Sequence, residues 1–329
     1  MLNGVKSDFI LKKLKLYLNQ IKYLKIFKYT KNFQQKLNID INEYKTFLQI
    51  EIELKIYQDD PYLEGEDENF INYAGNKSNY HIYFENEEKE SKRNYISKKD
   101  NISKIRIIID RDIKSFKELF SYSSAREINF IKFNRKDITN MNSMFKECSY
   151  LNKLYLSNFN TENVSDMRNM FSFCSELKEL DLSKFNTSNV LYMNNMFECC
   201  AKLEHLDLKN FDTSKVLNMS SMFSYCESLR YLDLGNFNTI KVTDMSFMFE
   251  YCSSLKKIEI KNFNTENVIN MRYMFKKCKL LMDLDISKFK LNNLLYIDFM
   301  FTGCSKELKN KIRSQIVLKE EAFYNKFGI

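Results

Sequence analysis

The dipeptide Met-Phe returns every 26 residues, and this spacing is the strongest constraint that the sequence places on the fold. A fixed period of this length is typical of solenoids, in which each unit forms one coil and packs only against its neighbours. The unit that starts at Leu177 reads L-x-x-L-x-L-S-x-F-N-T-x-x-V-x-x-M-x-x-M-F-x-x-C-x-x. The seven copies of the dipeptide begin at Met144, Met170, Met196, Met222, Met248, Met274 and Met300.

Two hydrophobic periodicities alternate within each unit. Leu180 and Leu182 are two residues apart, which places both on one face of a short strand. From Val190 to Cys200 the apolar residues fall at offsets 0, 3, 6, 7 and 10, which indicates one face of a helix. Thr187 lies where a helix N-cap is expected, and Thr161, Thr213, Thr239 and Thr265 are equivalent to it. Each unit is therefore predicted to be a strand, a capped helix and a return loop.

These residues resemble a known repeat family. The L-x-x-L-x-L segment and the fuller phrase LDLSKFNTSNVLYMNNMFECC resemble the BspA-like leucine-rich repeats of bacterial and protist surface proteins, from about Ala125 to Cys304. The recurrent cysteine also resembles the cysteine-containing class of these repeats, common in F-box proteins. The resemblance implies an α/β leucine-rich repeat solenoid, with parallel strands on the concave face and helices on the convex face. It also implies a binding scaffold.

The ends of the array differ from its interior. The strand-like KIRIIID and the apolar residues from Ile113 to Phe120 predict a degenerate first coil, with Ser123 in place of the cysteine. After the last cysteine, the apolar residues Leu308, Ile312, Ile316, Phe323 and Phe327 predict a helix that covers the open end, with a basic membrane-surface helix as the alternative. The predicted array spans residues 101–306, with the degenerate coil at 101–124, seven repeats at 125–306 and the capping helix at 307–329.

The first hundred residues have a different character. Residues 1–50 predict two or three short helices, and Phe9, Leu11, Leu14 and Leu18 give them a weak similarity to an F-box, which docks onto a Skp-type adaptor. The early proline and the late tryptophan of that module are missing. A plain helical extension and a basic membrane-binding segment are the alternatives. Residues 51–100 predict an acidic linker with one strand, YHIYF.

Charge is unevenly distributed along the chain. Residues 1–37 hold nine lysines and one acid, whereas residues 59–90 hold ten acids and two lysines. Opposed blocks of this kind can pair with each other or with separate partners. No dense arginine stripe is present, so nucleic acid is not an expected partner. No signal peptide or transmembrane segment is evident, so the expected location is cytoplasmic, or the cell surface if the N-terminus is incomplete.

Seven of the eight cysteines form one column, with one residue per unit. The column lies on the predicted apolar stripe, and a buried free cysteine behaves as a small hydrophobe. Zinc needs four converging ligands, often from C-x-x-C pairs, and none of these pairs occurs. Packing is therefore the expected role, with a disulfide or a metal site as the alternative. The column is Cys148, Cys174, Cys200, Cys226, Cys252, Cys278 and Cys304.

The sequence contains no motif of a known catalytic site. G-x-S-x-G, H-E-x-x-H and a P-loop are all missing, and His81 and His205 are the two histidines. We therefore predict no catalytic, metal-binding or cofactor-binding residues and no cofactor.

The strand residues that flank the inward leucines are expected to face outward. They predict an acidic column, with its members about 4.8 Å apart, which would attract a basic or mixed protein surface. A solvated face neutralised by neighbouring lysines is the alternative. The candidate partner-binding residues are Tyr155, Asp181, Asp207, Asp233, Glu259 and Asp285, together with His205 and Tyr231 near the centre.

These observations predict a non-enzymatic leucine-rich repeat scaffold that binds a protein through its concave sheet face. One alternative is an F-box-like substrate receptor of a ubiquitin ligase, with a Skp-type adaptor at the N-terminus. The other is a BspA-like cell-surface adhesin.

Overall fold

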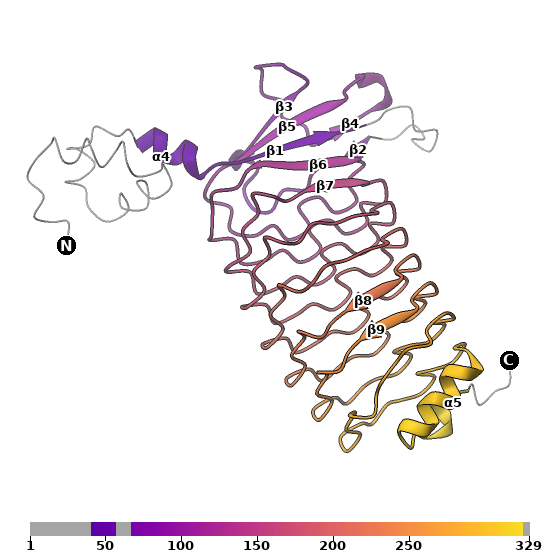
Figure 1. Cartoon of the computed structure of the whole chain (residues 1–329). Helices are drawn as coiled ribbons and strands as arrows, with labels where there is room; N and C mark the ends of the chain where they lie inside the picture. Colours follow the sequence, from indigo (N-terminus) through magenta and orange to yellow (C-terminus); the bar gives the residue numbers. More distant parts are fainter. Residues whose placement is uncertain (1–40, 57–66, 325–329) are drawn as a thin grey trace, which may run out of the picture.

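The computed structural model describes residues 41–56 and 67–324 (Figure 1). Helix α4 (Ile41–Leu48) precedes the first strand, and helix α5 (Lys306–Gln315) closes the other end. Short strands, turns and bends make up most of the chain between them. The strands are β1 (Ile50–Lys55), β2 (Glu68–Asn69), β3 (Tyr80–Phe84), β4 (Tyr95–Ile96), β5 (Lys104–Ile109), β6 (Glu127–Lys132), β7 (Lys153–Tyr155), β8 (Tyr231–Asp233) and β9 (Lys257–Glu259), and the 3-10 helices are η1 (Lys77–Asn79), η2 (Lys98–Asp100) and η3 (Glu320–Ala322).

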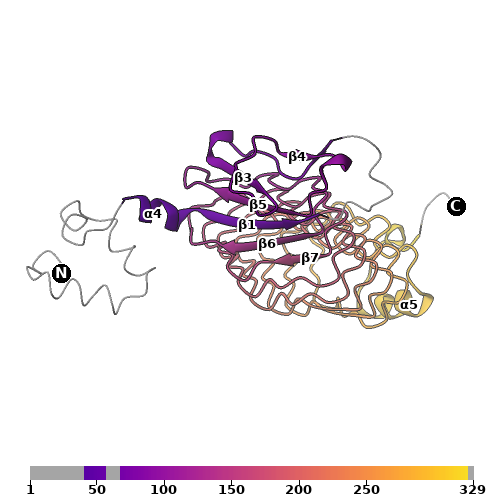
Figure 2. The ribbon, with the colours of Figure 1, turned by 90° about the horizontal axis from the view of Figure 1, so that it is seen from above.

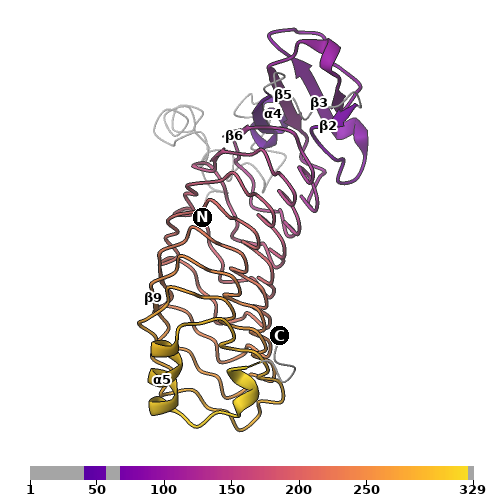
Figure 3. The same ribbon diagram turned by 90° about the vertical axis from the view of Figure 1, so that its right-hand side faces the viewer.

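The 26-residue units follow one another as a stack of coils (Figures 1 and 3). On one side of each coil, here called the strand side, β6 pairs in parallel with β7 and β8 pairs in parallel with β9. Later in each unit, residues 166–174 and their equivalents form a second side, here called the turn side. On the turn side, isolated parallel β-bridges join each coil to the next, and the two residues of each bridge are 25 or 26 apart in the sequence. The bridged residues are, in order, Ser115, Asn140, Asp166, Tyr192, Asn218, Asp244, Asn270 and Tyr296.

Columns of apolar side chains fill the inside of the coils. Nine phenylalanine rings, from Phe120 to Phe323, stack in one continuous ladder with centroids 5.3 to 5.7 Å apart. The leucines of the strand side and the methionines of the turn side pack around this ladder, and almost all are buried. Burying each such side chain contributes about 1.5–3 kcal/mol to stability, so every coil adds to a shared interior.

The helices predicted for the repeats are wrong. Between α4 and α5, the described residues contain no α-helix. Two tight turns follow each other instead: the amide of Met170 donates to the carbonyl of Met167 (3.3 Å), and that of Cys174 donates to Phe171 (3.1 Å). Asn169 and Phe173 have positive φ angles of 55° and 61°. A residue in this conformation ends each turn, because a right-handed helix requires negative φ.

Hydrogen bonds between coils explain why turns replace the helix. The amide of Asn169 donates to the carbonyl of Asn194 (3.1 Å), and that of Phe171 donates to Met196 (2.9 Å). In a helix these amides would bond within their own segment. Turns that repeat at three- and four-residue intervals bury the same positions as a helix face, and Val190, Met193 and Met196 are fully buried.

The predicted threonine caps have a different role. Thr187 is buried, and its hydroxyl donates to the carbonyl of Asp212 (2.9 Å) and accepts from the amide of the same residue (2.8 Å). Asp212 belongs to the next coil, so the threonine links two coils where a helix start was expected. Thr161, Thr213, Thr239 and Thr265 make the same pair of bonds to the following coil.

The first coil also differs from its prediction. Five strands lie side by side in the order β3-β5-β1-β6-β7 at this end of the stack (Figure 2). β5 belongs to the predicted coil at 101–124 but runs antiparallel to β1, which lies between it and β6. Alternating buried isoleucines specify the inner face of a strand but not its neighbour or direction. The segment after β5 does follow the coils, because the amide of Phe116 donates to the carbonyl of Asn140 (2.8 Å).

The C-terminal closure is shorter than the helix predicted at 307–329. Ser305 caps α5 by accepting a bond from the amide of Leu308 (3.1 Å), and the backbone is extended at Ile316. The side-chain amide of Gln315 donates to the carbonyl of Leu284 (3.0 Å) and accepts from the amide of Ile286 (2.9 Å). The side chain of Gln315 thus makes the backbone hydrogen bonds that the strand of a further coil would make. On the turn side, the amides of Phe299 and Phe301 donate to two carbonyls of η3, those of Glu321 and Ala322.

Candidate functional site

The strand side presents the candidate binding residues on its outer surface. In β8, Leu232 is fully buried, whereas Tyr231 and Asp233 on either side of it are exposed. The alternation of a strand produces this arrangement in each coil. The acidic column consists of Asp181, Asp207, Asp233, Glu259 and Asp285, all exposed except the half-buried Glu259, and Tyr155, His205 and Tyr231 are exposed near it.

The aspartates of this column also shape the backbone. Oδ1 of Asp181 accepts a hydrogen bond from the amide of Ser183 (2.9 Å), and Asp233 accepts in the same way from Gly235 (2.9 Å). Each carboxylate therefore stabilises a turn at the end of its strand. The bond from Ser183 holds the pKa of Asp181 below its usual range. Asp207 and Asp285 make the same turn. Outward-facing patterning alone did not reveal this structural role.

Lysines neutralise only part of the acidic column. Lys209 pairs with Asp207 at 2.7 Å, and Lys257 pairs with Glu259 at 2.8 Å. In the part of the chain that the structure describes, Asp181, Asp233 and Asp285 have no ion pair. Unpaired carboxylates therefore recur in every second coil, and one of them, Asp233, lies on the same strand as Tyr231, which is 45% exposed.

The cysteine column lies inside the stack. The Sγ atom of Cys200 donates to the carbonyl of Phe171 in the preceding coil (3.2 Å), and Cys252 donates likewise to Phe223 (3.1 Å). Burial raises the pKa of Cys252 to about 12. All eight thiols are free. The other five members of the column, Cys148, Cys174, Cys226, Cys278 and Cys304, are also buried and donate to a carbonyl of the preceding coil.

Thiol reactivity should follow this burial. We expect Cys199, which is only partly buried, to react first with a thiol reagent at pH 8. Burial raises the pKa of Cys199 to about 12 as well, so the difference should come from access. The seven column cysteines should react only when the protein unfolds, because a reagent cannot reach a fully buried thiol. Mass spectrometry of the labelled peptides, with and without guanidinium, measures both rates. Column cysteines that react as fast as Cys199 would contradict the packing role.

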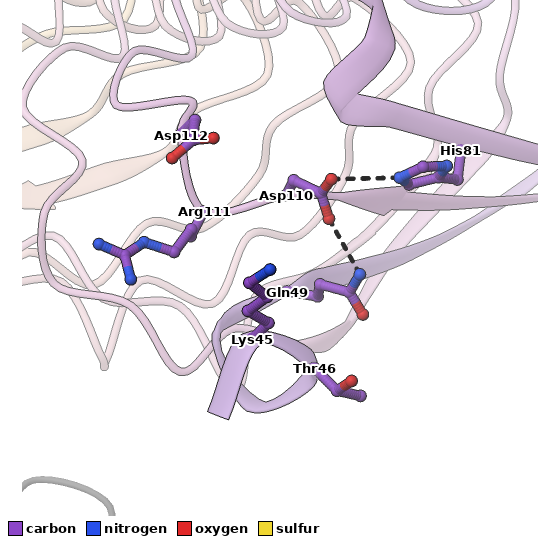
Figure 4. Close-up of a pocket in the computed structure, with 7 residues that line it drawn as sticks. All are labelled: Lys45, Thr46, Gln49, His81, Asp110, Arg111 and Asp112. Atoms are coloured by element: carbon purple, nitrogen blue, oxygen red, sulfur yellow. Dashed lines mark hydrogen bonds and ion pairs between the residues drawn. The ribbon is translucent and has the colours of Figure 1, made fainter. Parts of the chain in front are cut away.

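A pocket at the N-terminal end of the stack carried no sequence signal. It has a volume of about 470 Å³ and lies between α4 and the ends of β3 and β5 (Figure 4). The ring of His81 contacts two carboxylates, Asp110 at 3.2 Å and Glu90 at 3.5 Å. Both ring nitrogens are therefore engaged, which suits a structural link between strands better than proton transfer. The residues around the pocket are Lys45, Thr46, Gln49, His81, Asp110, Arg111 and Asp112.

In residues 41–56 and 67–324, no cluster of three or more histidine, cysteine or acidic side chains could hold a metal ion. None of the helices found there has the length and apolarity needed to cross a bilayer. The predicted adaptor-docking residues, Phe9 to Leu18, lie outside these ranges.

The stacked coils and their repeated columns define a repeat protein made mainly of short strands and turns. Residues 114–232 and 218–326 match the family described as "Mycoplasma protein of unknown function, DUF285". The chain belongs to this family. The match supports the resemblance to BspA-like leucine-rich repeats, and it does not extend to the F-box-like segment.

Among solved structures, the chain is similar to a leucine-rich repeat protein from Bacteroides ovatus. It is 18% identical, with a TM-score of 0.28, over 55% of this chain and 56% of that chain. The match thus spans little more than half the length of either protein. No curated protein matches this chain.

Proposed function

We propose that this chain is a non-enzymatic leucine-rich repeat solenoid that binds a basic polypeptide through its strand side. The observation that supports this best is the unpaired carboxylate of Asp233 on the same strand as the exposed ring of Tyr231, with Asp181 and Asp285 unpaired in the same column. Carboxylates in a row attract cationic side chains, and an exposed tyrosine is a frequent anchor in protein interfaces. The hydrogen bonds from the backbone fix the carboxylates in place before a partner arrives, which lowers the entropy lost on binding.

A charge-removal variant tests this proposal without disturbing the backbone. Asparagine keeps the Oδ1 acceptor of aspartate, so Asp181→Asn, Asp207→Asn and Asp233→Asn should preserve the turns at Ser183, Lys209 and Gly235. Lysine at these positions would remove the acceptor and weaken the fold. The triple variant should therefore separate charge from stability.

We expect the triple variant to bind basic peptides about tenfold more weakly, because each exposed ion pair contributes about 0.2–1 kcal/mol. The wild type is first panned against a random 12-residue peptide library, and selected peptides should be rich in lysine, arginine and apolar residues. Their affinities are then measured for both proteins at two salt concentrations, and the variant should show the smaller salt dependence. Selection of neutral or acidic peptides, or equal affinity for both proteins, would count against the strand side.

A further inference from the structure

A second surface, on the turn side of the last coils, is built from aromatic residues. Tyr225 and Tyr251 stack with ring centroids 4.5 Å apart, and Tyr273 stacks on Phe247 at 4.8 Å and on Phe299 at 5.0 Å. All five rings are partly exposed. These two short ladders, here called the aromatic turn surface, lie outside the buried phenylalanine column.

Each of these five residues has a backbone conformation that suits it poorly. Their φ angles lie between 58° and 61°, a region that bulky side chains rarely adopt and asparagine tolerates. Earlier coils use Asn169 and Asn195 at the position of Phe247 and Tyr273, with φ of 55° and 60°. The fold therefore has a less strained choice at this position. Tyr225 and Tyr251 occupy the other positive-φ position, which holds Glu147, Phe173, Cys199 and Lys277 in other coils. For Phe247, Tyr273 and Phe299, strain kept at a partly exposed surface indicates a use beyond stability.

Positively charged residues are frequent in one coil of this surface, where Arg272 pairs with Asp298 at 3.4 Å. Residues 271–282 include Arg272, Lys276, Lys277 and Lys279 and no acid. Nζ of Lys276 lies 4.7 Å from the ring centroid of Tyr273 and pairs with Glu250 at 2.9 Å. Among the described residues, Lys277 and Lys279 form no ion pair. These two cations therefore remain available to a negatively charged partner.

The ring geometry limits what this partner can be. Rings stacked 4.5 to 5.0 Å apart cover each other's faces, so nucleic acid bases or sugar rings cannot stack between them. The ring edges remain open, and the edge of an aromatic ring is its positive part. Carboxylates and apolar side chains both suit such edges. We propose that the aromatic turn surface binds an acidic polypeptide segment, with carboxylates on Lys277 and Lys279 and apolar side chains against the ring edges.

Fluorescence anisotropy with a labelled 12-residue peptide, Asp-Leu repeated six times, tests the proposal. We expect binding to the wild type and a loss of at least tenfold in affinity for Phe247→Asn with Tyr273→Asn, and for Lys277→Gln with Lys279→Gln. The asparagine variant should fold, because earlier coils hold asparagine at the same position. Circular dichroism and thermal unfolding check this. The control is Phe173→Asn, a ring with positive φ in an earlier coil, which should bind like the wild type.

Three results would overturn the proposal: no binding of the Asp-Leu peptide by the wild type, full affinity in both folded double variants, or tighter binding of a twenty-residue oligothymidine than of the peptide. The acidic strand side repels this probe, so the result does not depend on the basic-peptide site proposed above.

Discussion

Replacing Leu232 by aspartate is expected to unfold the coils on both sides of β8. Leu232 is fully buried, and a carboxylate there would lose its water without gaining a partner. Because each coil packs against its neighbours, the damage should spread from β8 in both directions. We expect the free energy of unfolding to fall by more than about 4 kcal/mol. Limited proteolysis should then cut within residues 200–260, and urea unfolding measures the loss.

The matched control for this change is Tyr231→Asp, one residue earlier. Its side chain is 45% exposed on the same strand, so the new charge stays in water. The free energy of unfolding should change by no more than about 0.5 kcal/mol. If the Leu232→Asp protein resists protease as the wild type does, then Leu232 does not face a packed interior.

The second large effect is expected for Thr213→Val, which removes one hydroxyl and keeps the shape of the side chain. The amide of Asn238 would lose its acceptor at 2.8 Å, and the carbonyl of Asn238 would lose its donor at 3.0 Å. Each unsatisfied group costs about 1–3 kcal/mol when buried, so we expect a loss of about 2–4 kcal/mol, measured by urea unfolding.

Two further variants distinguish the hydroxyl bridge from simple packing. Thr213→Ser keeps the hydroxyl and loses one methyl group, which should cost about 1 kcal/mol. Thr243→Val removes a hydroxyl that lies on the exposed surface and bonds the carbonyl of Leu217 at 3.3 Å, and it should have little effect. Equal losses for Thr213→Val and Thr213→Ser would show that the bridge between coils contributes nothing.

The sequence predicted which residues face inward but not the backbone that carries them. Val190, Met193 and Cys200 are buried at the expected spacing. Two tight turns and a helix share this spacing, so periodicity cannot distinguish them. The deciding contacts join residues 25 apart, such as Phe171 and Met196, and no local pattern reports them. Asparagine at positions 169 and 195 was a usable sign, because it tolerates positive φ.

Side-chain roles at the strand side were predictable only in part. The alternation around Leu232 gave the outward direction of Tyr231 and Asp233. It did not reveal that Asp233 bonds the amide of Gly235, although aspartate two residues before glycine or serine is a known turn signal. Nor did it reveal the pairing of Lys209 with Asp207, because the geometry of long flexible side chains depends on the folded surface.

The closure by Gln315 has a consequence for how such a chain can change its length. The side chain of Gln315 bonds Leu284 and Ile286 of the last coil, and the antiparallel strands at the other end join the stack at β6 of the first coil. Neither end depends on how many coils lie between them. Duplication or loss of one whole 26-residue unit would therefore keep both ends and every column in register, whereas gain or loss of a single residue would misalign the phenylalanine, threonine and cysteine columns. Surface area for binding partners can grow in steps of one coil while the two closures stay the same.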